Sequence, residues 1–299
     1  MQHDPVNMAQ AQALHPNWRS EDTILARLAR NAAEVPNQVA MRERDHGIWQ
    51  EYTWADYLRA VVEFAAGLEA RGVKPGDVVM VIGDNRPNLY FAMLGAACLR
   101  AIPSPAYADA PTEELAAQME REDIRVAVAE DQEQVDKMLE ARGRWSHLGL
   151  IIYDDPRGLA GQEPEGVAGF DAIRAEGAAR LAADPNLAKS LIARSTIHDI
   201  VVLMHSSGTT GAPKGIPLKH GHILSGVRNA AAAGYFGAGE VHMAYLPMAW
   251  VGDSSFPSAR RWSCALPSTS PKRTKRRCTT CGKWRLRCIL HPPAPGRPC

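Results

Sequence analysis

Apolar residues recur at helical spacing between Trp54 and Leu68, which predicts a helix with one face turned toward a core. Thr53 followed three residues later by Asp56 is typical of a capped helix start, and Gly72 marks the stop. The apolar positions of this helix are Trp54, Tyr57, Leu58, Val61, Ala65 and Leu68.

Short apolar runs alternate with such helices along the rest of this region. A Pro-Gly turn at 74–77 leads into a strand over 78–82, and Pro87 opens a second apolar helix that runs to about Leu99. A strand at 102–104 follows, and then the unit repeats. Its members are a strand at 126–129, a helix from about Asp131 to Ala141 and a strand at 148–153. This alternation predicts an α/β fold, with a largely parallel sheet covered by helices.

A loop rich in glycine and hydroxyl side chains follows the apolar strand at 200–204. It reads Ser-Ser-Gly-Thr-Thr-Gly-Ala-Pro-Lys-Gly over 206–215. Glycines let backbone N–H groups close on an anion, hydroxyls add donors, and Lys214 supplies a positive charge. The segment is therefore predicted to cradle a polyphosphate, which indicates an enzyme that uses a nucleotide.

Spacing excludes two common nucleotide-binding loops. A P-loop needs Gly-Lys-Ser/Thr four residues after its first glycine, but Pro213 stands at that place and Gly215 follows Lys214. The dinucleotide pattern fails as well, because the three glycines are wrongly spaced and no acidic residue lies about twenty positions on. A flexible Gly/Ser/Thr linker is a weaker interpretation, because a linker needs neither Pro-Lys at its centre nor an apolar strand before it.

Residues 206–215 resemble the phosphate loop of the adenylate-forming superfamily, which includes acyl-CoA synthetases, luciferases and the adenylation domains of peptide synthetases. The resemblance covers about residues 15–256, and segments 52–57, 72–79 and 84–87 look like the N-terminal half of acyl-CoA synthetases. Segments 130–135 and 153–158 resemble the bacterial long-chain and bubblegum-type subgroup, which favours a fatty acid as the substrate.

The resemblance implies an ATP-dependent fatty acid–CoA ligase. A fatty acid carboxylate attacks the α-phosphorus of ATP to give acyl-adenylate and pyrophosphate, and the thiol of coenzyme A then displaces AMP. ATP, Mg²⁺ and coenzyme A are the implied cofactors. Lys214, Thr209 and Thr210 are the expected catalytic residues, with Lys214 balancing the charge of the departing pyrophosphate. The residues expected to hold the ATP phosphates are Ser206, Ser207, Gly208, Thr209, Thr210, Gly211, Lys214 and Gly215.

Three further residues outside this motif are candidates for the site. Trp250 falls in a segment, 245–253, that resembles the border of the acyl pocket in the superfamily, although an ordinary core tryptophan is an equal alternative. His205 ends the strand before the loop, and we expect it to pack or to shape that loop. His220 stands where the family often has histidine, and a structural role at a helix start is the favoured interpretation.

Charge divides the chain in two. All 33 acidic residues precede position 254, whereas 11 of the 34 Lys and Arg lie from Arg260 onward. The net charge of +1 is therefore the sum of about −10 for the chain before Arg260 and +11 for the chain from Arg260 onward. The basic part holds five of the six cysteines. Cys278, Cys281, Cys288 and His291 have spacing that could close a zinc site, and the surrounding arginines suggest nucleic-acid binding as an alternative function.

A shifted reading frame is the simpler interpretation of this tail, because another frame over 266–285 permits a sequence typical of globular protein. We therefore expect a disordered N-terminus over 1–15, a partial AMP-binding domain over 16–256, and a disordered, out-of-family tail over 257–299. No metal site and no nucleic-acid partner are expected. The small-molecule partners are a fatty acid, ATP and coenzyme A.

Several segments that the family needs are not found in this sequence, including those expected to hold adenine and ribose and a C-terminal domain with a catalytic lysine. The chain alone is therefore expected to be inactive and poorly soluble, and an ATP-binding remnant without catalysis is the alternative. The N-terminus lacks a signal pattern and no apolar run reaches the length of a membrane span, which favours a cytoplasmic location. Acyl chain length, oligomeric state and contact with a membrane surface stay open.

Overall fold

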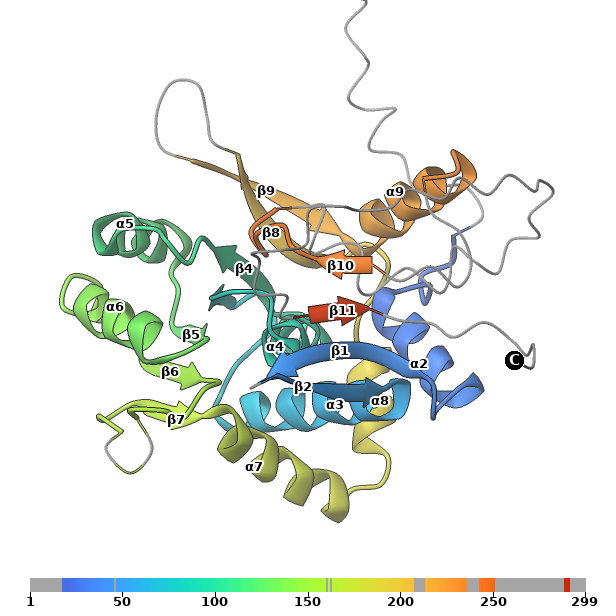
Figure 1. Ribbon diagram of the computed structural model, residues 1–299, viewed down its shortest axis with the longest axis horizontal. Helices are drawn as coiled ribbons and strands as arrows, with labels where there is room; N and C mark the ends of the chain where they lie inside the picture. Colours follow the sequence, from blue (N-terminus) through green and yellow to red (C-terminus); the bar gives the residue numbers. More distant parts are fainter. Residues whose placement is uncertain are drawn as a thin grey trace, which may run out of the picture.

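The computed structural model describes residues 18–250 with gaps at 46, 160, 162, 207–212 and 236–241, together with the backbone of 288–290. Its centre is a five-stranded parallel sheet with the strand order β4-β3-β5-β6-β7. Figure 1 shows helices on both faces of this sheet. The strands are β3 (Val78–Ile82), β4 (Ile102–Ala106), β5 (Val126–Ala129), β6 (Leu150–Tyr153) and β7 (Val167–Gly169). The predicted fold class is confirmed.

The two faces of the parallel sheet carry separate apolar cores. Successive side chains of a strand point to opposite faces, so Val79 and Val81 of β3 join one core while Met80 and Ile82 join the other. The first core lies under α3 (Trp54–Ala70) and α4 (Pro87–Cys98). The second lies under α5 (Thr112–Glu122) and α6 (Gln132–Arg142).

Local sequence signals account for the starts of these helices. At α3, the Thr53 hydroxyl accepts from the Asp56 backbone N–H at 3.1 Å and the Asp56 carboxylate accepts from the Thr53 N–H at 3.0 Å. This reciprocal pair is the predicted capping box. Pro87 occupies the first turn of α4, and Asp131 caps α6 through a bond from Gln134 N–H. The predicted helices are confirmed to within a few residues.

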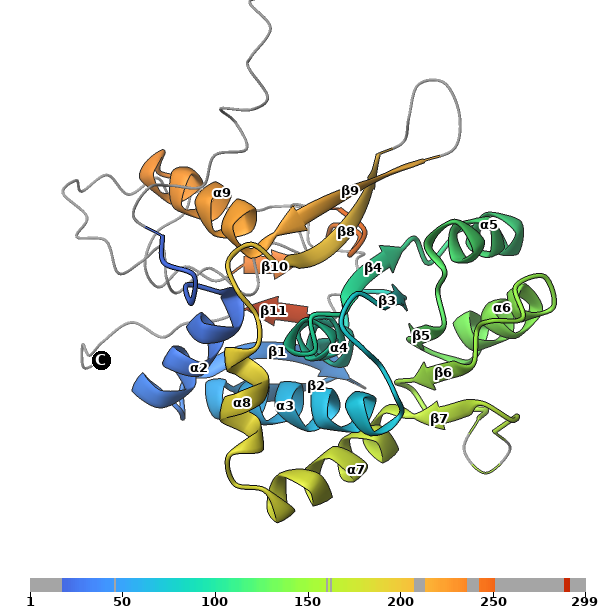
Figure 2. The same ribbon diagram turned by 180° about the vertical axis from the view of Figure 1, so that it is seen from behind.

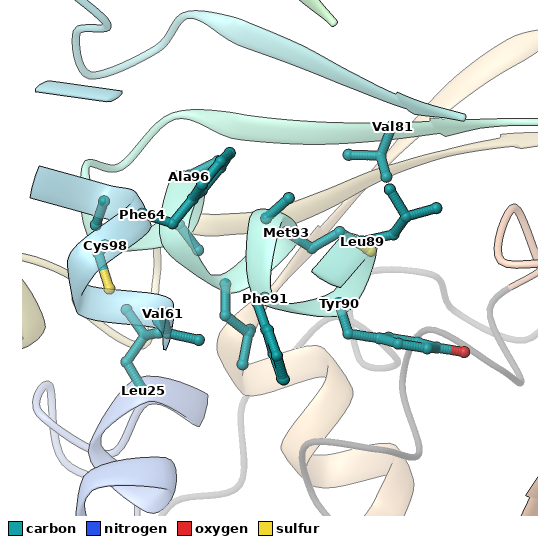
Figure 3. Close-up of a cluster of buried hydrophobic side chains, with 14 of the residues drawn as sticks. Leu25, Val61, Phe64, Val81, Leu89, Tyr90, Phe91, Met93, Ala96 and Cys98 are labelled. Atoms are coloured by element: carbon teal, nitrogen blue, oxygen red, sulfur yellow. The ribbon is translucent and has the colours of Figure 1, made fainter. Parts of the chain in front are cut away.

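Aromatic side chains fill the centre of the first core. Figure 3 shows Phe91 of α4 among other buried side chains of this core. The Phe91 ring lies 4.9 Å from that of Tyr57, centroid to centroid, and both side chains are almost fully buried. Cys98 is buried in the same core, and burial raises the pKa of its thiol to about 12. Cys98 is therefore a packing residue rather than a nucleophile.

Two further helices close the lower side of this core. α7 (Phe170–Ala183) crosses α3, and α8 (Leu187–Ala193) lies beside both. Phe64 of α3 stacks on Phe170 with centroids 4.3 Å apart. Gly67 and Gly177 stand where the two helices touch backbone to backbone, since a Cβ added at Gly177 would lie 1.7 Å from the Glu63 carbonyl oxygen. The crossing needs glycine at both positions.

A second sheet is antiparallel, with the order β10-β11-β1-β2. It comprises β1 (Val39–Asp45), β2 (Ile48–Thr53), β10 (His242–Ala244) and β11 (Cys288–Leu290). β11 lies within the tail that we expected to be disordered, and it pairs with both β1 and β10 through the apolar run Cys-Ile-Leu. The remainder of the predicted tail, and all of residues 1–15, lie outside the described residues.

The chain after the parallel sheet forms a separate hairpin of β8 (Ile200–Ser206) and β9 (Lys214–Lys219), followed by α9 (His220–Ala232). In Figure 2 this hairpin stands beside β4, with α9 at its far end. α2 (Ile24–Glu34) packs against α3 and α8. Within the described ranges, no helix is long and apolar enough to cross a bilayer.

Candidate functional site

The β8–β9 hairpin carries the predicted phosphate loop at its tip. Its last two residue pairs are His205 with Gly215 and Ser206 with Lys214. These pairs bring both ends of the loop to adjacent strand positions. Ser206 is partly buried, whereas Lys214 and Gly215 are exposed. The candidates Ser207, Gly208, Thr209, Thr210 and Gly211 lie outside the described residues.

A buried hydrogen-bonded pair lies at the loop end of β8. His205 Nε2 approaches Glu122 Oε1 at 2.6 Å, and the two side chains are 10% and 7% exposed. Glu122 is the last residue of α5. Its other oxygen, Oε2, accepts from the Ser104 hydroxyl at 2.7 Å. Gln118 in turn donates to the Ser104 oxygen at 3.1 Å. His205 is therefore tied to the end of α5 at the position just before Ser206, and its role in shaping the loop stays a prediction.

Glu122 stays ionised in this setting. Burial on its own raises the pKa of the carboxyl, but the bonds from His205 and Ser104 outweigh it and the pKa falls below the ordinary value. A buried carboxylate with donors on both oxygens has one stable orientation. The Glu122–His205 pair thus joins β8 to the end of α5. The link lies at the second residue pair from the loop, His205 with Gly215.

A second charged cluster lies at the carboxyl ends of β3, β5 and β6. Arg86 Nε donates to Glu130 Oε1 at 2.8 Å, and its terminal nitrogens lie 3.4 Å from Glu43 and 3.8 Å from Asp155. Burial on its own lowers the pKa of Arg86, but Glu130 and Glu43 raise it above the usual value. The nearby Asp154 is partly buried, and this burial raises the pKa of Asp154 to about 6.

The Arg86 cluster also reaches the segment that carries Trp250. The side-chain amide of Asn85 donates to the Leu246 carbonyl at 2.8 Å. The Trp250 backbone N–H donates to the Pro247 carbonyl at 2.8 Å, which closes a turn. Half of the Trp250 side chain is exposed, so it is not a core tryptophan. The acyl-pocket role of Trp250 stays a proposal.

His220 is fully buried at the start of α9. Its Nδ1 accepts from the Ile24 backbone N–H at 3.3 Å, so the ring ties α9 to the start of α2. Burial lowers the pKa of His220 to about 4, although Asp199 opposes the shift. The imidazole is therefore neutral at pH 7, which fits a structural role better than proton transfer.

Lowering the pH should destabilise the protein through His220. Above pH 6.5 the imidazole is neutral in the folded and unfolded chains alike. Between pH 6.5 and 4 the unfolded chain binds a proton that the folded chain excludes, so the free energy of unfolding should fall by about 3 kcal/mol. Chemical denaturation at a series of pH values measures this loss.

The matched variants are His220→Asn, which keeps an acceptor for Ile24, and His198→Asn at an exposed histidine. His220→Asn should remove most of the difference in pH dependence, and His198→Asn should leave the wild-type profile unchanged. If the wild-type and His220→Asn profiles run parallel, the assignment of this pH dependence to His220 is wrong.

The candidate zinc ligands Cys278, Cys281 and His291 lie outside the described residues, as does the side chain of Cys288. Among the side chains that the structure describes, no group of three or more His, Cys, Asp or Glu could hold a metal ion.

The sequence did not reveal the two polar clusters. Glu122 and His205 are 83 positions apart, and Arg86 and Glu130 are 44 apart. The one available signal is a polar residue shortly after each of β3, β5 and β6, at the carboxyl ends of parallel strands, where loops gather. That signal applies to Arg86, Glu130 and Asp154, but it does not apply to Glu122, which ends a helix.

The family model for AMP-binding enzymes matches residues 28–286, which is most of the chain. The protein therefore belongs to the AMP-binding enzyme family. The match also extends beyond residue 256, where we expected the resemblance to end.

Curated relatives include both aryl and fatty acid ligases. 4-Coumarate–CoA ligase 3 from Oryza sativa subsp. japonica is 33% identical over 207 residues, covering 67% of this chain and 33% of the relative. Long-chain-fatty-acid–CoA ligase FadD15 from Mycobacterium tuberculosis is 26% identical over 237 residues, covering 77% of this chain and 37% of the relative. The chain thus spans about a third of the length of these relatives, which differ in the acid that their names specify.

Solved structures share the fold. Acetoacetyl-CoA synthetase from Streptomyces lividans aligns with a TM-score of 0.64 at 22% identity, over 79% of this chain and 36% of that one. The anthranilate–CoA ligase AuaEII in complex with anthranoyl-AMP aligns with a TM-score of 0.59 at 23% identity, over 72% of this chain and 37% of that one. At these identities the likeness concerns the fold alone.

Proposed function

We propose that this chain carries the ATP phosphate-binding part of a ligase that activates a carboxylic acid as an acyl-adenylate and transfers the acyl group to coenzyme A. The observation that carries the proposal is the Ser/Thr/Gly-rich segment at the tip of the β8–β9 hairpin, with the exposed Lys214 paired with Ser206. An exposed cation and a partly buried hydroxyl at adjacent strand ends can contact a phosphate from one side.

The proposal divides the work among the loop residues. Lys214 would balance charge as it develops on the departing pyrophosphate, and Thr209 and Thr210 would donate hydroxyl bonds to the β- and γ-phosphates. Ser206, Ser207 and the backbone N–H groups of the loop glycines would complete the cradle. Mg²⁺ would bind with the nucleotide and neutralise phosphate charge there.

A fatty acid is the proposed substrate. We also propose that the enzyme is cytoplasmic and acts on small molecules. The segments at 130–135 and 153–158 favour this choice, and the FadD15 relative is consistent with it. A hydroxycinnamic acid is the second candidate, because a 4-coumarate–CoA ligase is the more identical of these two relatives. Trp250 is proposed to border the acyl pocket in either case.

Replacing Lys214 with alanine should weaken Mg-ATP binding by about tenfold to a hundredfold, because a charge-assisted phosphate contact contributes about 1.5–3 kcal/mol. Isothermal titration of the wild-type chain and of Lys214→Ala measures the two dissociation constants. Lys189→Ala is the matched control, since Lys189 is an exposed lysine on α8. Equal affinities for all three chains would contradict the role of Lys214.

Exchange of labelled pyrophosphate into ATP separates catalysis from simple binding. A series of fatty acids of increasing length and 4-coumarate are compared at fixed Mg-ATP. Exchange that depends on a fatty acid supports the proposed substrate, and exchange with 4-coumarate alone favours the second candidate. Mg-ATP binding without exchange identifies an ATP-binding remnant, and a chain that does not bind Mg-ATP contradicts the proposal.

A further inference from the structure

We propose that Glu122, His205, Ser104 and Gln118 form a positioning network that fixes the β8–β9 hairpin at its loop end for phosphate binding. This inference rests on the function proposed above for the loop. None of the four is proposed to touch the nucleotide, so they act through the hairpin backbone.

The hairpin needs such a link because no strand ladder supplies one. β8 packs beside β4, yet among the described residues these strands belong to separate sheets. Backbone pairing therefore joins β8 to β9 but not to the parallel sheet. At the loop end, side chains provide a polar link: His205 of β8 bonds to Glu122 of α5, and Glu122 bonds to Ser104 of β4.

The geometry of this link is restrictive. His205 occupies one oxygen of Glu122 at 2.6 Å and Ser104 the other at 2.7 Å, while Gln118 holds the Ser104 oxygen. Arg121 places a positive charge 3.7 Å from Glu122 Oε1. A carboxylate bound on both oxygens cannot rotate without losing a bond in a buried site. The fixed carboxylate of Glu122 thereby restrains the His205 ring.

A neighbouring pair shows the contrast. His147 and Asp123 also join a histidine to the end of α5, but at 3.4 Å and with both side chains 56% exposed. Exposed pairs contribute little to order, because water competes for their partners. The buried pair is therefore the one suited to restrain the hairpin.

Restraint matters at this place because a phosphate cradle works best when its donors are already in position. His205 is one residue before the loop and pairs with Gly215, the second residue after Pro213. Holding this pair limits how far the two loop ends can move. Binding then needs less ordering of the loop, which strengthens it.

The test compares His205→Phe, His205→Gln and Ser104→Ala with His147→Phe as the matched control. Phenylalanine keeps a ring but removes both nitrogens, and glutamine restores one N–H donor for Glu122. Ser104→Ala removes a second donor from Glu122 without changing a residue of the hairpin, which covers the case in which His205→Phe does not fold. Amide hydrogen exchange over 203–206 and 214–216, Mg-ATP affinity and thermal unfolding are measured for each chain.

We expect His205→Phe and Ser104→Ala to exchange about tenfold faster in these segments and to bind Mg-ATP about tenfold more weakly. His205→Gln should lie close to the wild type, and His147→Phe should match it. A lower unfolding temperature with unchanged hairpin exchange or unchanged affinity would make the network purely structural and overturn this inference. Absence of Mg-ATP binding by the wild type would instead overturn the proposed function, and the nucleotide role of the network with it.

Discussion

Replacing Arg86 with leucine should lower the free energy of unfolding by about 4 kcal/mol at pH 7, because it removes the counter-charge that Arg86 supplies to a cluster of buried carboxylates. Glu130, Glu43 and Asp155 all lie within 4 Å of the guanidinium, and each is at most 10% exposed. Removing one partner of a buried ion pair costs far more than the pair itself contributes. Urea denaturation of the variant measures the loss.

The pH dependence distinguishes this cause from lost packing. Without Arg86, the pKa values of the neighbouring carboxyls rise in the folded state above those in the unfolded chain. As the pH rises, the unfolded chain therefore loses its protons first, and the free energy of unfolding of the variant falls. The loss should therefore be much smaller at pH 4 than at pH 7. Arg59→Leu is the control, since the Arg59 side chain is 60% exposed and pairs with Asp56 within one helix, and it should cost less than about 1 kcal/mol. An Arg86→Leu loss that does not change with pH would indicate a packing defect.

Replacing Gly177 with alanine should destabilise the protein by at least about 4 kcal/mol, or prevent folding, because α3 and α7 must separate to admit a methyl group. The added Cβ would lie 1.7 Å from the Glu63 carbonyl oxygen and 2.8 Å from the Gly67 nitrogen. Both are backbone atoms, so no side-chain rotation relieves the clash. Thermal unfolding and the yield of soluble protein measure the effect.

The control is Gly226→Ala. Gly226 also lies inside a helix, α9, but a Cβ added there meets nothing within 4 Å. Alanine favours the helix over glycine by about 1 kcal/mol, so this variant should be slightly stabilised. The two substitutions are chemically identical, but their effects on the free energy of unfolding should have opposite signs. If Gly177→Ala were as mild as its control, the close approach of α3 and α7 would be wrong.

The sequence determined the features that depend on neighbouring residues. Helix α3 was predictable because Thr53 and Asp56 cap it locally and its apolar positions follow the helical period. The parallel sheet was predictable because β3, β5 and β6 are short apolar runs between helices. The phosphate-loop residues were named from their chemistry and from the resemblance of 206–215 to the adenylate-forming superfamily, and the structure places Ser206, Lys214 and Gly215 at the two ends of the loop.

The tertiary structure decided which distant residues meet. That β8 leaves the parallel sheet and pairs with β9 was not predictable from its apolar composition, which suits either arrangement. The partners of Glu122 and Arg86 were hidden for the same reason. A charged side chain at a helix end or after a strand is ordinary in a sequence, and its role depends on burial and on partners brought close only by folding.

The division has one physical origin. Caps, turns and apolar periods are set by atoms a few residues apart, so the sequence by itself determined the α/β class and the main helices, and it supplied the phosphate-binding hypothesis for the loop. The glycine contact of α3 with α7, the buried Arg86 cluster and the Glu122–His205 pair join positions separated by tens of residues. Only the packed chain decided these contacts, because each exists through desolvation and close approach that no local segment can produce.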